Sequence, residues 1–487
     1  MKKNILLLFL LIIVRTTTNC QTVQLSNTTI NQGGFEYTSV LGQLDEGFIA
    51  LQRNIPIGTE KERVGLKSRK LQLSYYNNAL IKQWQLPATT AIAASNIENI
   101  FVFDSKVFII YSTFNKESST MEFYTDTYSS AGKSLELKNK IGTVSITKYN
   151  NLEKSRVVMS PDKKSFCIYQ NETEDISQTI NLITYHQSNN IKTTNFRLNY
   201  GRGQLYLNNY LLDNVGNFYL TGQVKNKENK KQKSSYLFCF ISSINSVIEK
   251  MITDYNSPIS DIIIKYNPIR EEIVCGGIGV DNTSYSGSGI KLLTVDSLYQ
   301  FKEINYSIQG SSLKELIGER NTSGISLDNY TLQDLILRED GGAILIAEAQ
   351  YLSEYSFYDQ FTQTFNRRTE YHFDNIIVFS VSPEGTIDWC RVIKKEQVSM
   401  DDFGIFSSFA FYLNNEELGI IYNKDSGRNF ELMHVLITKE GQLTSKRINK
   451  SNIDAIIPKY NRQTDATEIC APVLMKRQQY LAKIEFE

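Results

Sequence analysis

Apolar and polar residues alternate in short runs along this chain, and turn-forming residues separate the runs at regular intervals. The clearest example is the stretch 334–393, where one apolar run ends at Gly341 and Gly342 and a second run follows directly. A similar pair of runs surrounds Gly385. Glycine adopts the positive φ that a tight hairpin turn requires, so both places predict a β-hairpin. Two successive hairpins predict a four-stranded antiparallel meander.

Weaker copies of this unit fill the rest of the chain, with a turn-to-turn spacing of roughly 50–75 residues that is typical of elaborated propeller blades. The last unit retains only three strand-like runs, while residues 22–26 form an isolated run without a hairpin partner. If residues 22–26 complete the last blade, the two ends close the ring and protect its edge. We therefore predict one all-β domain over residues 21–487, a β-propeller of eight four-stranded antiparallel blades closed by N- and C-terminal strands. A seven-bladed ring with an irregular tail is the alternative.

Two units carry insertions, a polar one at about 305–329 and an aromatic one at 351–373. Long excursions from a rigid sheet often carry binding function, and Tyr and Arg are enriched in binding hot spots. The predicted binding residues of the aromatic insertion are Tyr351, Tyr355, Tyr358, Arg367, Arg368 and Tyr371. The alternative is a structural hairpin whose rings pack against a neighbouring blade.

The N-terminus has the pattern of a secretory signal peptide. Lys2 and Lys3 precede an apolar run of about ten residues, which is too short for a stable membrane anchor. We expect residues 1–20 to be removed and the mature protein to be exported, to the periplasm, the cell surface or the medium. A lipid anchor at Cys20 is the less favoured alternative, because Asn19 is not a small residue.

Composition limits the partners. The 52 basic and 52 acidic residues cancel, which argues against nucleic-acid binding. No later segment is apolar enough over a sufficient length to predict a transmembrane helix. The remaining cysteines are scattered and show neither paired nor zinc-binding spacing, so we expect small buried side chains. They are Cys167, Cys239, Cys275, Cys390 and Cys470.

Motifs of catalysis are scarce: the chain has no P-loop, no GxSxG and no HExxH motif, and its three histidines are isolated. We expect no cofactor and no metal site. One feature recurs with the repeat, because Glu98, Asp261, Asp334 and Asp454 each precede the first turn of a unit by about seven residues. In a propeller this position lies near the start of the innermost strand. Asp261, Asp334 and Asp454 are therefore the candidate catalytic carboxylates, with hydrogen bonding to neighbouring loops as the simpler explanation.

A set of residues in the last third of the chain forms a recognisable pattern. It consists of Gly341, Gly342, Glu348, the Tyr-rich insertion 351–373, the stretches 375–378 and 383–389, Asp401, Asp402, Phe406, Ser407, Ser408 and the final stretch 480–486. With these residues the last third resembles a family of exported, largely uncharacterised β-propeller-like proteins of Gram-negative bacteria. The resemblance implies the fold and export, and it supplies no activity or catalytic residues.

Two functions follow as hypotheses. The first is a non-enzymatic binding or scaffold module of the cell envelope, with a protein or glycan partner. The second is a carbohydrate-active hydrolase or lyase that uses carboxylates at the mouth of the central channel.

Overall fold

The structure is a computed structural model that describes residues 22–30, 37–53, 71–93, 95–147, 155–173, 177–199, 203–226, 233–253, 259–281, 287–309, 327–359, 361, 363–414, 416–425, 430–448 and 453–486. The expected signal peptide, Cys20 and most of the polar insertion lie outside these residues.

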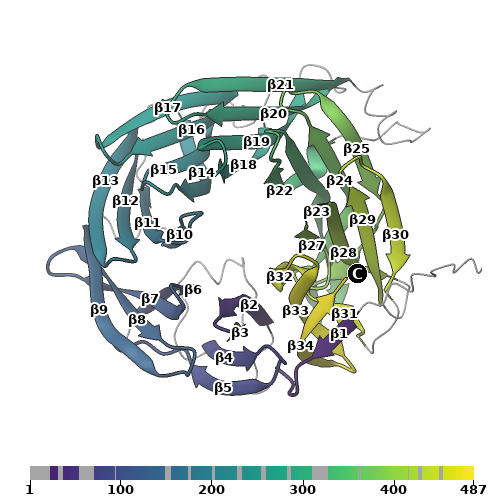
Figure 1. Cartoon of the computed structure of the whole chain (residues 1–487), viewed down its shortest axis with the longest axis horizontal. Helices are drawn as coiled ribbons and strands as arrows, with labels where there is room; N and C mark the ends of the chain where they lie inside the picture. The colour runs from purple at the N-terminus through teal and green to yellow at the C-terminus, as the bar shows by residue number, and fades with distance from the viewer. Residues whose placement is uncertain are drawn as a thin grey trace, which may run out of the picture.

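Eight antiparallel sheets stand around a central opening like the blades of a propeller (Figure 1). Within each sheet the chain runs from the innermost strand outwards. The strands of blades 1 to 4 are β2 (Tyr37–Leu44), β3 (Gly47–Arg53), β4 (Leu71–Asn77), β5 (Lys82–Pro87), β6 (Asn96–Phe103), β7 (Lys106–Asn115), β8 (Thr120–Tyr128), β9 (Ser134–Ser145), β10 (Arg156–Met159), β11 (Ser165–Thr173), β12 (Ser177–His186), β13 (Asn190–Asn199), β14 (Gly203–Leu212), β15 (Phe218–Asn226), β16 (Lys233–Ile241) and β17 (Ser246–Thr253).

Blades 5 to 8 repeat the arrangement, and blades 6 and 8 each include a fifth strand. Their elements are β18 (Ile259–Asn267), β19 (Glu272–Asp281), β20 (Gly287–Val295), β21 (Phe301–Gln309), the 3-10 turn η4 (Leu327–Asn329), β22 (Tyr330–Leu337), β23 (Ala343–Asp359), β24 (Thr364–Val381), β25 (Ile387–Ile393), β26 (Val398–Met400), β27 (Ala410–Leu413), β28 (Glu417–Asp425), β29 (Phe430–Thr438), β30 (Leu443–Arg447), β31 (Ala455–Ile456), the 3-10 turn η5 (Pro458–Tyr460), β32 (Arg462–Asp465), β33 (Glu468–Met475) and β34 (Gln478–Glu485).

The eight-bladed prediction and the predicted closure are confirmed. Strand β1 (Thr22–Leu25) pairs antiparallel with β34 and forms the outer strand of blade 8. The pairing continues past the strand, where the Ser26 N–H donates to the Leu481 carbonyl at 2.8 Å and the Ile30 N–H donates to the Gln479 carbonyl at 2.9 Å. The first and last segments of the ring therefore cover each other's edges.

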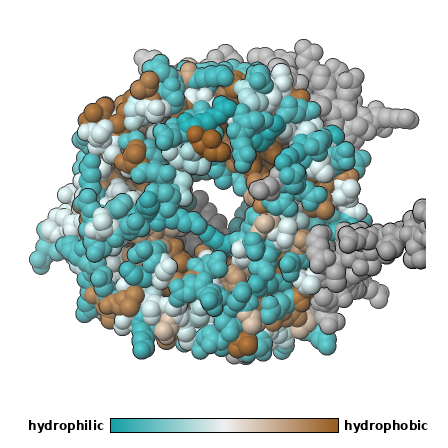
Figure 2. Space-filling model, in the orientation of Figure 1, coloured by the Kyte–Doolittle hydropathy of each residue, from teal (hydrophilic) through white to brown (hydrophobic). Residues whose placement is uncertain are grey.

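The hydrophobic core is a ring of eight clusters, one at each blade-to-blade interface. The cluster between blades 8 and 1 shows the principle, because Phe48 and Tyr76 of blade 1 pack with Cys470 and Leu481 of blade 8. Each sheet is buried on both faces, which explains why strict alternation of apolar and polar residues is weak along the strands. Hydrophilic residues cover most of the face seen in Figure 2, with hydrophobic residues scattered among them.

Both tryptophans secure a blade to the next one in the same way. The Trp84 indole N–H donates to the Ser130 carbonyl at 2.6 Å, and the Trp389 indole N–H donates to the Lys439 carbonyl at 2.8 Å. The Trp84 indole also lies against Gly132, and the Trp389 indole lies against Gly441. These glycines have φ values of +73° and +76°, so the turn requires glycine for its backbone and for close approach of the indole.

Residues 455–460 divide into β31 and η5, because Pro458 supplies no N–H for a continuing strand. Within the aromatic insertion, residues 351–359 and 364–373 extend β23 and β24 as regular paired strands. The polar insertion starts later than predicted, since residues 305–309 belong to β21.

Candidate binding surface

Beyond the body of blade 6, strands β23 and β24 continue as a two-stranded hairpin. Residues 350–359 pair with residues 364–373 without interruption, and a register shift between Glu348 and Gln350 separates this hairpin from the blade. Strand β26 adds as a third strand beside Glu370, Tyr371 and His372. We call residues 350–373 together with β26 the aromatic ribbon.

The ribbon has two faces, because successive side chains of a strand point to opposite sides and paired residues share a side. Face A carries the odd-numbered residues of β23, including Tyr351 and Tyr355, with Arg368 opposite Tyr355. Face B carries the even-numbered residues, including Tyr358. Tyr371 pairs with Leu352 and Arg367 pairs with Ser356, so both also belong to face B. The six predicted binding residues are thus divided equally between two faces, and no flat partner contacts all of them at once.

Face A combines aromatic rings with one cation. Tyr351 stacks on His372 with ring centroids 4.3 Å apart, and the Tyr355 hydroxyl lies 3.8 Å from the Met400 sulfur. Partial burial and the nearby Asp374 carboxylate raise the pKa of Tyr351, so its hydroxyl stays protonated at neutral pH.

Arg368 lies in the middle of face A, opposite Tyr355. Its guanidinium binds the Asp401 carboxylate at 2.9 Å and lies 5.7 Å from the centre of the Phe357 ring. The backbone amide of Thr369 and the Arg368 charge both lower the pKa of Asp401. Arg368 therefore has a fixed position while remaining partly exposed, which suits recognition of a polar group.

Face B is more apolar. Tyr358 and Phe365 lie with ring centroids 5.1 Å apart near the tip, and Tyr371 and Phe403 lie 5.9 Å apart near the base. Arg367 forms an exposed ion pair with Glu354 between these two ring pairs. Face B thus has two pairs of aromatic rings, one near the tip and one near the base, with the Arg367–Glu354 ion pair between them.

The rings of the ribbon are exposed. Among the described residues, six of the seven exposed aromatic side chains lie on the ribbon or beside it, and Tyr206 is the seventh. Phe361 at the tip is fully exposed, and Phe365 is 77% exposed. The six are Tyr351, Tyr355, Tyr358, Phe361, Phe365 and Phe403. These six rings are therefore not buried against a neighbouring blade.

A buried ion pair between Glu348 and Lys395 secures the base of the ribbon, and the sequence analysis did not identify Lys395. The Lys395 ammonium lies 2.7 Å from the Glu348 carboxylate, and both side chains are buried. The Ser408 hydroxyl donates to the same carboxylate at 2.6 Å. Burial lowers the pKa of Lys395, and the Glu348 charge opposes this shift. Glu348 and Ser408 appear in the motif of the resemblance above, which was the available signal.

The buried ion pair continues into a network across three blades. Lys395 also donates to Gln397 at 2.7 Å, and Gln397 donates to the Asn423 carbonyl of blade 7 at 2.5 Å. The Asn423 side chain exchanges hydrogen bonds with the Ile456 backbone in blade 8. The segment that follows blade 6 is therefore fixed to the ring beneath the ribbon.

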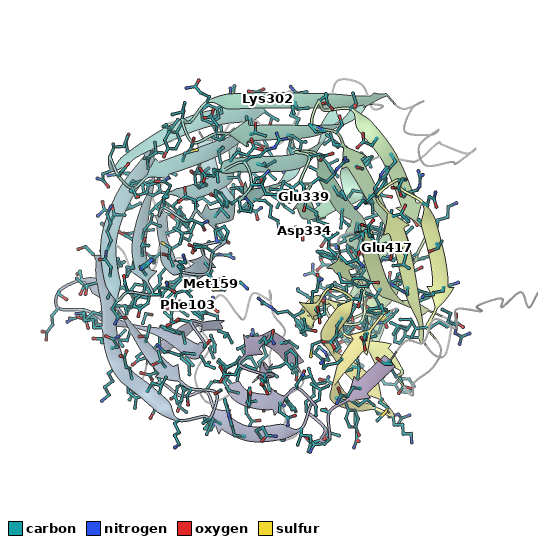
Figure 3. All side chains as sticks on the ribbon, in the orientation of Figure 1. Phe103, Met159, Lys302, Asp334, Glu339 and Glu417 are labelled. Atoms are coloured by element: carbon teal, nitrogen blue, oxygen red, sulfur yellow. The ribbon has the colours of Figure 1, made fainter. Side chains whose placement is uncertain are left out.

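The candidate catalytic carboxylates lie on the inner ring, on different blades. Asp261 and Asp334 each follow a register shift near the start of β18 and β22, and Asp454 directly precedes β31. Figure 3 shows Asp334 beside the central opening. Glu98, the fourth acid of this pattern, is buried in β6 and accepts a hydrogen bond from Ser112 at 2.5 Å.

Two of the three candidates are occupied by neighbouring groups. Asp334 pairs with Lys265 of blade 5 at 2.8 Å, and Asp454 accepts a hydrogen bond from the Lys476 backbone at 2.6 Å. Burial raises the pKa of Asp261, and the Lys233 charge partly offsets this effect.

A cavity of about 590 Å³ lies between blades 6 and 7, next to the turns that join their first and second strands. Its lining includes the apolar side chains of Trp389, Leu418 and Ile437 and the charged side chains of Glu417 and Lys439. Arg338 also lines it and is held by Asp340 and Asp388, which neutralise its charge.

Groups suited to metals or redox chemistry are not assembled in the described residues. No cluster of three or more His, Cys, Asp or Glu side chains there has an arrangement that holds a metal ion. The five cysteines Cys167, Cys239, Cys275, Cys390 and Cys470 are buried and form no disulfide among themselves. Burial raises the pKa of the Cys167 thiol to about 12, which leaves it unreactive.

Within the described part of the chain, no helix has the length and apolar character needed to cross a membrane.

Comparisons with known proteins find similarity to solved structures only. No family model and no curated protein sequence matches it. Among solved structures it is similar to the polysaccharide lyase Uly1, with 12% identity and a TM-score of 0.39 over 93% of this chain and 100% of that one.

Two other solved structures give the same level of similarity. The WD40 domain of SCAP from fission yeast has 9% identity and a TM-score of 0.39 over 96% of this chain and 98% of that one. The β-propeller domain of the Trilobed protease from Pyrococcus furiosus has 8% identity and a TM-score of 0.33 over 82% of this chain and 96% of that one. Similarities of this size carry no argument about activity, and the strand pairing itself defines the chain as an eight-bladed β-propeller.

Proposed function

We propose that this chain is an exported, non-enzymatic binding module of the cell envelope that engages a protein or glycan partner through the aromatic ribbon. The observation that carries the proposal is the concentration of exposed rings on the ribbon, six of seven among the described residues. Exposed apolar groups gathered in one place on a soluble fold mark interaction sites. Export rests on the N-terminal pattern of charged and apolar residues.

The ribbon suits binding because its side chains are arranged in advance. Paired strands fix the backbone of residues 350–359 and 364–373, and the buried Glu348–Lys395 pair fixes the base. Binding then costs the ribbon less conformational entropy than it would cost a flexible loop. Tyr and Arg provide large contact areas together with hydrogen-bonding groups.

A carbohydrate-active hydrolase or lyase is the second candidate. Hydrolysis of a glycosidic bond by carboxylates requires two carboxyl groups about 5–10 Å apart in an open site. Asp334 and Asp454 already have partners, which leaves the raised pKa of Asp261 as the observation in favour, since a general acid needs a raised pKa. Loss of polysaccharide cleavage in Asp261→Asn would support this candidate, and a glycan panel without cleavage by the unaltered protein would remove it.

The test of the binding proposal compares the unaltered protein with a triple variant, Tyr355→Ala, Tyr358→Ala and Arg367→Ala, in pull-downs from envelope extract and on a glycan array. We expect capture to be lost and the melting temperature to change by no more than about 2 °C, because the three side chains are exposed.

The matched control replaces exposed apolar residues elsewhere on the ring, Val215→Ala and Leu298→Ala, which are 78% and 76% exposed. This control should capture the partner like the unaltered protein. Capture that persists in the triple variant, or that is lost equally in the control, would contradict the proposal.

A further inference from the structure

The two edges of the aromatic ribbon differ. The outer edge of β24 is covered, because β26 pairs with Glu370, Tyr371 and His372. Asp401 extends this cover, as its N–H donates to the Thr369 carbonyl at 2.9 Å. The opposite edge belongs to residues 350–359 of β23, and no described residue pairs with it, because the pairing of β22 with β23 ends at Ala349.

The direction of the backbone groups along β23 follows from bonds on the far side of β24. The Phe373 N–H donates to Gln397, and the Thr369 N–H and carbonyl both bond to Asp401, so these groups point away from β23. In an antiparallel pair, both partners at such a position point their N–H and C=O groups outwards. The partners of Phe373 and Thr369 are Gln350 and Glu354.

The alternation of an unbroken ladder extends this result to the whole edge. The register is continuous from residue 350 to residue 359, so the even-numbered residues present N–H and C=O groups to the open edge. They are Gln350, Leu352, Glu354, Ser356 and Tyr358. The odd-numbered residues direct the same groups to β24.

We infer that this edge binds an extended segment of a partner protein by strand addition, so that the partner becomes the next strand of the ribbon beside β23. The inference rests on the proposed function and chooses a protein over a glycan. An open edge offers donors and acceptors at a repeat of about 6.8 Å, and another β-strand carries the complementary groups at that repeat.

The edge also lacks the features that protect edge strands from pairing. Natural edges are short, or carry proline, a bulge or charged side chains such as lysine. Residues 350–359 contain neither lysine nor proline and no register shift, and their two acidic residues are Asp359 at the end and Glu354, which pairs with Arg367. The molecule itself uses strand addition twice, where β1 adds to β34 and β26 adds to β24.

The side chains beside the edge define the chemistry of the partner. Leu352 and Tyr358 on face B and Tyr351 and Tyr355 on face A leave apolar surface beside an added strand. The charge of Glu354 is neutralised by Arg367. The partner segment is therefore extended and uncharged, with apolar residues that reach both faces.

The test uses peptides as long as the edge, selected from a displayed random library on the full-length protein. Ser356 directs its N–H to the open edge and Ser353 directs its N–H to β24, so these two serines separate the alternatives. Ser356→Pro removes an edge donor and leaves the β23–β24 ladder intact, and proline is tolerated at such positions. We expect at least about tenfold weaker peptide binding, because a backbone hydrogen bond is lost and the ring obstructs the approach of a strand.

Two matched variants complete the test. Ser356→Ala keeps the N–H and should bind like the unaltered protein. Ser353→Pro should disrupt the ribbon and raise hydrogen exchange in β24. In the selected peptide, N-methylation should abolish binding at every second residue and be tolerated at the residues between, because only alternate amides face β23.

The outcomes separate the two proposals. If Ser356→Pro binds peptide as tightly as Ser356→Ala, or if N-methylation shows no period of two, strand addition is wrong. Partner capture that the triple ribbon variant abolishes while Ser356→Pro leaves it unchanged would retain the binding surface and overturn strand addition. Dimerisation that Ser356→Pro abolishes would make a second copy the occupant and would also overturn the inference.

Discussion

The two halves of strand β23 have the same backbone and opposite surroundings. In residues 343–349 the side chains Leu345, Ile346 and Ala347 are completely buried. In residues 350–359 Leu352 is 64% exposed and Tyr358 is 51% exposed. The first half lies between β22 and β24 and between two blades, whereas the second half pairs with β24 alone among the described strands.

The comparison teaches that β-propensity specifies the strand and that the neighbours specify its burial. Apart from Glu348, the first half consists of small and aliphatic residues, which pack closely against the adjacent blades. Aromatic residues and serine fill the second half, where a strong strand preference keeps the backbone extended without a core. Residues free of packing constraints are available for binding.

The largest expected effect concerns the ion pair at the junction of the two halves. Glu348→Ala leaves the Lys395 charge buried without its partner and should lower the free energy of unfolding by about 3–5 kcal/mol. Denaturant unfolding measures the loss. Adding Lys395→Met should recover part of the stability, and a loss below about 1 kcal/mol would show that the pair is solvated and not part of the core.

A matched pair of leucines tests the comparison directly. Leu345→Ala removes a fully buried side chain and should cost about 2–5 kcal/mol. Leu352→Ala, in the same strand, should change stability by less than about 0.5 kcal/mol. Equal losses in thermal or denaturant unfolding would mean that the ribbon is packed as tightly as the blade.

Acid should destabilise the ring through a buried histidine. Burial, reinforced by the Lys446 charge, lowers the pKa of His434 to about 3. The imidazole of His434 lies against the side chain of Phe486 in the last blade. The unfolded state then binds more protons than the folded state between pH 6.5 and 3, so stability is lost as the pH falls. The slope is at most about 1.4 kcal/mol per pH unit, and a loss of roughly 3 kcal/mol is expected by pH 4.5.

His434→Phe isolates this contribution. The variant loses the hydrogen bond between His434 and Tyr412, which lowers stability equally at every pH. Its unfolding free energy should fall less steeply with acid than that of the unaltered protein. Parallel pH profiles would show that His434 is protonated within the fold.

The smallest effect belongs to the ribbon. Arg367→Ala removes one partner of an exposed ion pair and should change stability by less than about 0.5 kcal/mol. A double-mutant cycle with Glu354→Ala measures their coupling, expected at about 0–1 kcal/mol. A coupling well above 1 kcal/mol would place the pair in a desolvated environment and weaken the contrast between the two halves.

The sequence predicts the architecture well because its signals are local. Gly216, Gly341, Gly385 and Gly441 all occupy turns with positive φ, and each marks a hairpin without knowledge of the fold. The closing strand could be predicted because residues 22–26 had no local partner.

The binding surface could be predicted only in part. Its location follows from aromatic residues in sequence, but the division into two faces depends on a register that starts after the irregularity between Glu348 and Gln350. The pairing of Lys395 with Glu348 joins residues far apart in the chain and needs the three-dimensional structure. The interruption at Pro458 could have been anticipated, because proline disfavours a continuous inner strand.

The pairing of β1 with β34 also sets the order of events in folding. Thr22 and Glu485 are separated by 463 positions, so their strands meet only after nearly the whole chain has been synthesised. Contacts of such long range slow folding, because the chain must lose loop entropy before they form. During that interval the outer edge of β34 in blade 8 is open to other chains, and the short strand β1 removes this site of aggregation only when it pairs.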